Sequence, residues 1–155
     1  MTFADIFSEV LNAFNSNNVN YMVVGGYAVN FHGYERNTSD LDIWVKPSKD
    51  NLNLVVQALS KLGFEQDALN HIAYFNPSEP FLFHIGTEPD DIEVFNFVTG
   101  VKYEEAEPHK VPFLDSNGLQ VYFISIRDLL VNKMLAGRSQ DKLDVEMLQR
   151  IQDLK

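Results

Sequence analysis

The chain contains 155 residues and no cysteine, and its 22 acidic and 12 basic side chains give a formal net charge of −10. This length, with 45% hydrophobic residues, predicts one globular domain over residues 1–155 and excludes disulfide scaffolds and cysteine-based metal sites. The acidic charge disfavours duplex nucleic acid as a partner. No apolar run approaches the roughly 20 residues of a membrane span, and the first ten residues do not resemble a signal peptide, so we expect a cytoplasmic protein without a membrane partner.

The first 63 residues are expected to alternate between helix and strand. Apolar residues recur at i, i+3 and i+4 in the helical segments, and short apolar runs predict the strands. Ser48 and Gly63 are suitable cap residues for the last helix of this part. In chain order we expect a helix over 3–14, a strand over 21–24, a short helix ending near Gly33, a strand over 40–45 and a helix over 48–62.

The rest of the chain is expected to form several strands and two closing helices. Prolines and glycines separate the apolar runs, Asn117-Gly118 predicts a hairpin turn, and Ser125 with Asp128 has the form of a capping box. The expected strands cover 72–75, 81–85, 91–98, 111–114 and 119–123. A helix over 126–137 should turn Leu129, Leu130, Lys133 and Met134 inward, and a last helix from Ser139 should do so with Leu143, Met147, Ile151 and Leu154. This order predicts an α+β, or α/β-like, fold.

Asp40 and Asp42 are the first candidate site residues. One residue separates them on a predicted strand, so both carboxylates leave the same face with Cα atoms about 6.6 Å apart. A like-charged pair on an apolar strand is costly unless a cation compensates it. Mg²⁺ prefers such oxygen ligands and keeps positions open for phosphate oxygens. The alternative is a polar edge strand with two solvated aspartates.

Gly25 and Gly26 lie upstream of these aspartates, between the first predicted strand and the short helix. Two glycines let backbone amides approach an anion closely, and a helix start adds positive potential. The alternative is a simple tight turn. Thirteen residues separate Gly26 from Asp40, and they include Arg36 and Thr38 just before the aspartates.

The segments Val24-Gly25-Gly26 and Asp40-Leu41-Asp42-Ile43 resemble the signature of the DNA polymerase β-like nucleotidyltransferase superfamily. Almost the whole chain is similar to the small bacterial minimal and abortive-infection-type families within it. The resemblance implies a nucleotidyltransferase fold, with a mixed central sheet flanked by helices and with C-terminal helices. It also implies an enzyme that uses two Mg²⁺ ions to move an NMP group from an NTP, ATP first, to a hydroxyl on a small molecule or protein. Antibiotic-resistance enzymes and toxin–antitoxin systems are the related settings.

The superfamily has a third carboxylate on a later strand. Glu93, which is followed by Val94 and Phe95, matches that strand context best, and Asp91 is the reserve choice because alternation places it on the same face. Related small proteins usually have Asp where this chain has Glu93. This departure keeps open a catalytically weakened, antitoxin-like protein of the same fold that acts by binding a nucleotide or partner. The resemblance thus assigns catalysis and metal binding to Asp40, Asp42 and Glu93, and nucleotide binding to Gly25, Gly26, Arg36, Thr38 and Lys133.

Lys133 also stands out by its helical phase, because it lies within a stripe that should pack inward. A lysine there either binds an anion or extends its charge to solvent at the edge of the stripe. The resemblance favours a contact with the triphosphate. Arg138 and Asp141 are expected to form an ion pair that joins the last two helices, and the alternative is a contact with the substrate.

Overall fold

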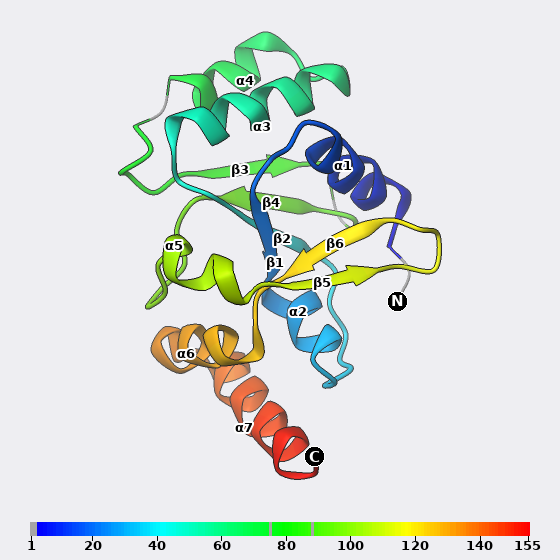
Figure 1. Cartoon of the computed structure of the whole chain (residues 1–155), viewed down its shortest axis with the longest axis vertical. Helices are drawn as coiled ribbons and strands as arrows, with labels where there is room; N and C mark the ends of the chain where they lie inside the picture. The colour runs from blue at the N-terminus through cyan, green and yellow to red at the C-terminus, as the bar shows by residue number, and fades with distance from the viewer. Residues whose placement is uncertain (1–2, 75, 88) are drawn as a thin grey trace.

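The structure, a computed structural model, describes residues 3–74, 76–87 and 89–155. Its centre is a six-stranded mixed sheet in the order β3-β4-β2-β1-β6-β5 (Figure 1). Strand β1 is parallel to β6 and β2 is parallel to β4, whereas the pairs β1–β2, β3–β4 and β5–β6 are antiparallel. The strands are β1 (Tyr21–Val24), β2 (Leu41–Val45), β3 (Leu82–Ile85), β4 (Ile92–Phe95), β5 (Val111–Leu114) and β6 (Gln120–Phe123).

Helices cover both faces of this sheet (Figure 1). On one side lie α1 (Asp5–Ser16), α3 (Lys49–Lys61) and α4 (Gln66–Ala73). On the other lie α2 (Gly25–Phe31), α5 (Tyr103–Ala106), the 3₁₀ turn η1 (Glu107–His109), α6 (Ile126–Ala136) and α7 (Ser139–Asp153). None of the helices in the described ranges is both long and apolar enough to cross a bilayer. The α+β class with a mixed central sheet is therefore confirmed.

The two central strands are buried on both faces, as expected of strands with helices on each side. All four residues of β1 are buried. In β2 every residue is buried except Asp42, which is partly exposed. An acidic side chain thus interrupts the apolar centre of the sheet, on the face that α2 and α6 cover.

One predicted strand is wrong. Residues 72–74 do not form a strand but belong to the end of α4 and its C-cap Tyr74, and position 75 lies outside the described residues. Leu69 and Ile72 are the buried residues of α4, which packs on α3. Their spacing of three residues is that of one helix face, and the short apolar run did not reveal it. The short elements α5 and η1 were not predicted.

The predicted inward stripe of the last helix is also wrong. The buried residues of α7 are Asp141, Asp144 and Leu148, whereas Leu154 is 87% exposed and Leu143 is exposed as well. In α6, Lys133 is buried as predicted but Met134 is exposed. The physical reason is electrostatic, since α7 turns its acidic face toward the buried lysine of α6.

Candidate functional site

Asp42 and Glu93 lie side by side on the sheet. Strands β2 and β4 run parallel with Asp42 as the register partner of Glu93, and His84 of β3 is the partner of Glu93 on its other side. The His84 Nε2 atom lies 3.9 Å from Glu93 Oε1. Asp91, the reserve choice, precedes β4, where its carbonyl accepts a hydrogen bond from the backbone N–H of Leu41. The structure therefore places Glu93, rather than Asp91, in register with Asp42.

The surroundings of Asp42 favour its protonated form. Burial raises the pKa of Asp42 to about 7, with further contributions from the charge and hydrogen bond of Glu93 and from the charge of Asp40, while Lys133 acts in the opposite direction. Carboxylates that share a site without enough positive charge behave in this way. Asp42 therefore lies in a locally uncompensated negative field.

This field fits a divalent cation, whose charge would offset that of Asp42, Glu93 and Asp40. Within the described ranges, however, no group of three or more His, Asp or Glu side chains is arranged to hold a metal ion. Asp40 precedes β2 and accepts a hydrogen bond from the Ser39 hydroxyl, with Oγ 3.2 Å from Oδ1. The three carboxylates thus act on one another by charge without forming a closed ligand cage.

Gly25 and Gly26 bring the start of α2 against these side chains. Gly25 has a φ of 65°, in the left-handed region, and a Cβ atom there would collide with Asp42 Oδ2. A Cβ atom on Gly26 would collide with Thr38 Oγ1. The absence of side chains at both positions is therefore what lets the backbone of α2 approach Asp42 and Thr38.

Two hollows meet at Asp42. The first, a cleft of about 640 Å³, is lined by polar residues and glycines: Gly25, Gly26, Arg36, Asn37, Thr38, Ser39, Asp40, Asp42, Lys133, Arg138, Gln140 and Asp141. The second, of about 430 Å³, has apolar side chains in its lining as well as polar ones: Val24, Gly25, Asp42, Glu93, Phe95, Phe97, Val98, Thr99, Asn132, Lys133, Ala136 and Arg138. Seven of the eight predicted site residues therefore line the first cleft, and Glu93 lines the second.

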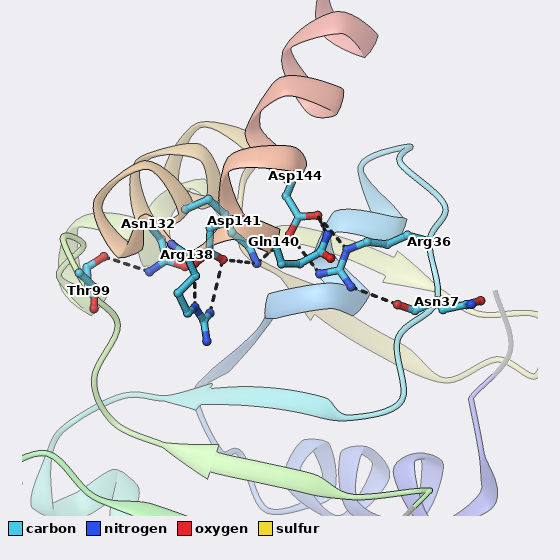
Figure 2. Close-up of polar contacts among 9 residues, drawn as sticks. Arg36, Asn37, Thr99, Asn132, Arg138, Gln140, Asp141 and Asp144 are labelled. Carbon is cyan, nitrogen blue, oxygen red and sulfur yellow. Dashed lines mark hydrogen bonds and ion pairs between the residues drawn. The ribbon is translucent and has the colours of Figure 1, made fainter.

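A network of ion pairs forms part of the wall of the first cleft (Figure 2). Lys133 Nζ lies 3.0 Å from both Asp141 Oδ1 and Asp144 Oδ2. Arg36 contacts Asp144 with its Nε at 2.8 Å and its Nη2 at 3.0 Å, and Arg138 Nε lies 2.8 Å from Asp141 Oδ2. The contacts tie α6, α7 and the loop between α2 and β2 together.

The buried aspartates of this network are held ionised. Burial alone would raise the pKa of Asp141, but hydrogen bonds from Arg138 and Lys133 outweigh it and lower that pKa below its ordinary value. The pKa of Asp144 is likewise lowered, because hydrogen bonds from Arg36, Gln140 and Lys133 outweigh burial. Both carboxylates are thus stable as anions inside the protein.

The network corrects part of the predicted connection between the last two helices. Arg138 and Asp141 do form the predicted ion pair, but both belong to the start of α7, where the Asp141 side chain also caps the backbone N–H of Arg138. Lys133 is the residue that links α6 to α7. Asp144 and Gln140 were not predicted, although the spacing of Asp141 and Asp144 on one helix face could have indicated them.

The comparisons with known proteins concern the fold. No family model and no curated protein matches the sequence. A solved structure from Thermotoga maritima, described as that of a candidate nucleotidyltransferase, aligns with 97% of this chain and 92% of its own at a TM-score of 0.58 and 12% sequence identity. At that identity the likeness concerns the architecture, so the chain shares the fold of this Thermotoga maritima protein.

Proposed function

We propose that the protein is a Mg²⁺-dependent nucleotidyltransferase that moves an NMP group from an NTP, with ATP the first choice, to a hydroxyl on a small molecule or a protein. The observation that carries the proposal is the register pairing of Asp42 with Glu93 at the junction of two hollows, with the pKa of Asp42 raised to about 7. Two like-charged carboxylates held together in a partly buried position are expensive to maintain for structure alone. The shared fold with a candidate nucleotidyltransferase supports the same proposal.

Asp42 and Glu93, with Asp40 close by, are the residues that would hold the metal. When bound, Mg²⁺ would supply positive charge both to these carboxylates and to the phosphate oxygens of the substrate. The same charge would offset the formal net charge of −10, which otherwise opposes the binding of an anionic nucleotide.

In this proposal the first cleft binds the phosphates and the second hollow receives the acceptor. The first cleft is polar and contains Thr38, Arg36 and the backbone of Gly25 and Gly26, which suit the phosphates. Glu93 lines the second hollow and not the first. On the acceptor side, its carboxylate would take the proton of the acceptor hydroxyl, whose oxygen attacks the α-phosphorus as pyrophosphate leaves.

The proposal is tested by incubating the protein with α-labelled ATP, Mg²⁺ and two acceptor pools: hydroxylated small molecules, including aminoglycosides, and protein extract. Label transfer with pyrophosphate release is expected for the wild type and not for Asp42→Asn. An exposed Asp153→Asn variant is the matched control and should transfer normally. Transfer by Asp42→Asn at the wild-type rate would overturn the mechanism.

A second candidate function is a nucleotide- or partner-binding regulator, antitoxin-like in character, without turnover. The observation that favours it is that the carboxylates in the described part of the chain do not form a closed metal cage. It predicts Mg²⁺-dependent ATP binding without pyrophosphate release in the presence of either acceptor pool.

A further inference from the structure

Five side chains form one continuous series of ion pairs behind the first cleft (Figure 2). Followed from contact to contact, their charges alternate in sign: Arg36, Asp144, Lys133, Asp141 and Arg138. Three cations and two anions leave the series with one surplus positive charge. The two aspartates of the series cannot neutralise that surplus. It acts on Asp42, which lines the same cleft, and it would act on an anionic ligand bound there with a metal ion.

Lys133, in the middle of the series, is poorly placed to use this charge. It is 5% exposed, and its Nζ lies 3.0 Å from carboxylates on both sides. A contact with a nucleotide phosphate would draw the ammonium away from two buried anions, and separating a buried ion pair is costly. Lys133 therefore positions Asp141 and Asp144, and through Asp141 it positions Arg138.

Arg138, at one end of the series, is much more accessible. Its side chain is 78% exposed, and it projects from the helix pair toward the sheet (Figure 2). A guanidinium has five N–H donors. Only Nε and Nη2 of Arg138 donate to Asp141, at 2.8 and 3.4 Å, and Nη1 makes no hydrogen bond to any residue that the structure describes.

Arg36, at the other end of the series, is less exposed and has fewer free N–H donors. Its side chain is 18% exposed, its Nε and Nη2 are used by Asp144, and its Nη1 donates to the carbonyl of Asn37 at 3.1 Å. Arg138 also lines both hollows, together with Asp42, whereas Arg36 lines only the first. The free donors and the surplus charge thus coincide at Arg138.

We propose that Arg138, and not Lys133, contacts the phosphates of the nucleotide, where the two hollows meet. The inference rests on the proposed function and names the group that supplies positive charge to that site. A planar guanidinium can offer two parallel N–H donors to a phosphate while Asp141 holds its other edge. Because Asp141 is itself fixed by Lys133, the arginine is oriented before the nucleotide arrives.

The test is calorimetric titration of ATP, adenosine and inorganic tripolyphosphate, each with Mg²⁺, into the wild type, Arg138→Gln, Arg138→Met and Arg150→Gln. Arg150 is the matched control, because it is an exposed arginine of the same helix, paired with Glu146, that does not line either hollow. Arg138→Met keeps the aliphatic stem of the side chain, so it serves if the Gln variant unfolds.

Both Arg138 variants should bind ATP and tripolyphosphate at least about 10-fold more weakly, the lower end of what a charged hydrogen bond contributes, and should bind adenosine almost as the wild type does. Arg150→Gln should bind all three ligands within about 2-fold of the wild type. Equal ATP affinity in the wild type and the Arg138 variants would overturn the inference and leave the proposed function intact. Equal losses for ATP and adenosine would overturn the phosphate assignment. A wild type that binds no ATP would overturn the proposed function, and the inference with it.

Discussion

Asp42 and Glu93 are register partners on adjacent parallel strands, and the charge of Glu93 adds to burial in raising the pKa of Asp42. The pairing joins segments that are 51 positions apart in the sequence. Neither residue could move away from the other without a slip in register, which would turn the side chains of a whole strand to the opposite face. The apolar neighbours in both strands therefore fix the distance between the acids.

We expect Asp42→Asn to change how stability depends on pH. The pKa of Asp42 rises from 3.8 to about 7 on folding. Between these values the native state binds more protons than the unfolded state, so the free energy of unfolding falls as the pH rises from about 4 to about 7. Asn cannot titrate, so the variant does not lose stability in this way. Relative to the wild type, its free energy of unfolding should increase by about 1 to 3 kcal/mol between pH 4 and pH 8. Urea denaturation with a chelator present measures it, and parallel pH profiles for the two proteins would contradict it.

Glu93→Gln should lower the pKa of Asp42 from about 7, because it removes a like charge from the neighbouring strand. The carboxyl resonance of Asp42 in an NMR titration reports the shift. Glu104→Gln, an exposed substitution on α5, is the control and should leave that resonance unchanged. An unshifted Asp42 pKa in Glu93→Gln would show that burial alone sets the value.

Lys133→Met should destabilise the fold, although methionine suits a buried helix position. The substitution leaves Asp141 and Asp144 buried with one partner cation fewer, and breaking a buried pair costs about 3 to 5 kcal/mol. The exposed Lys142→Met on α7 should change the free energy of unfolding by no more than about 0.5 kcal/mol. Urea midpoints that are the same for both variants would rule out this role for Lys133.

Gly25→Ala and Gly118→Ala separate backbone strain from the collision with Asp42. Both glycines have positive φ values, 65° and 83°, but a Cβ atom meets Asp42 at Gly25 and open space at Gly118. In both variants the free energy of unfolding should fall by about 1 to 2 kcal/mol, because alanine is strained in the left-handed backbone conformation. Only Gly25→Ala should also weaken Mg²⁺-dependent ATP binding, which calorimetry measures, and equal ATP affinity in the two variants would argue against a nucleotide site beside Gly25.

Sequence patterns predicted the helix that buries one face and the strands that are buried on both faces. The apolar stripe of α1 repeats with the helical period, and β1 and β2 are short apolar runs, so all three were predicted correctly. The strand expected over 72–75 failed because a short apolar run in an amphipathic helix has the same composition as a strand. The packing of α4 on α3 decides between helix and strand, and this packing cannot be recognised from a local sequence pattern.

The candidate site shows a similar limit. The spacing of Asp40 and Asp42 and the Gly-Gly pair could be recognised in the sequence, and the structure gathers them at one cleft. The partners of Lys133 were missed because a hydrophobic stripe on α7 was assumed to face inward, although Asp141 and Asp144 share one face of that helix. A buried cation on one helix requires anions on the next, and that requirement overrides apolar periodicity.

The attachment of α7 has a consequence for local unfolding. This helix packs chiefly on α6, and its buried face consists of two aspartates and one leucine. Charge pairs take the place of an apolar seam there, so less apolar area holds α7 in place than holds the central strands. In native-state hydrogen exchange, the amides of α7 should therefore open at a lower free energy than those of β1 and β2. One wall of the first cleft would then open as a separate cooperative unit while the sheet that carries Asp42 and Glu93 stays closed.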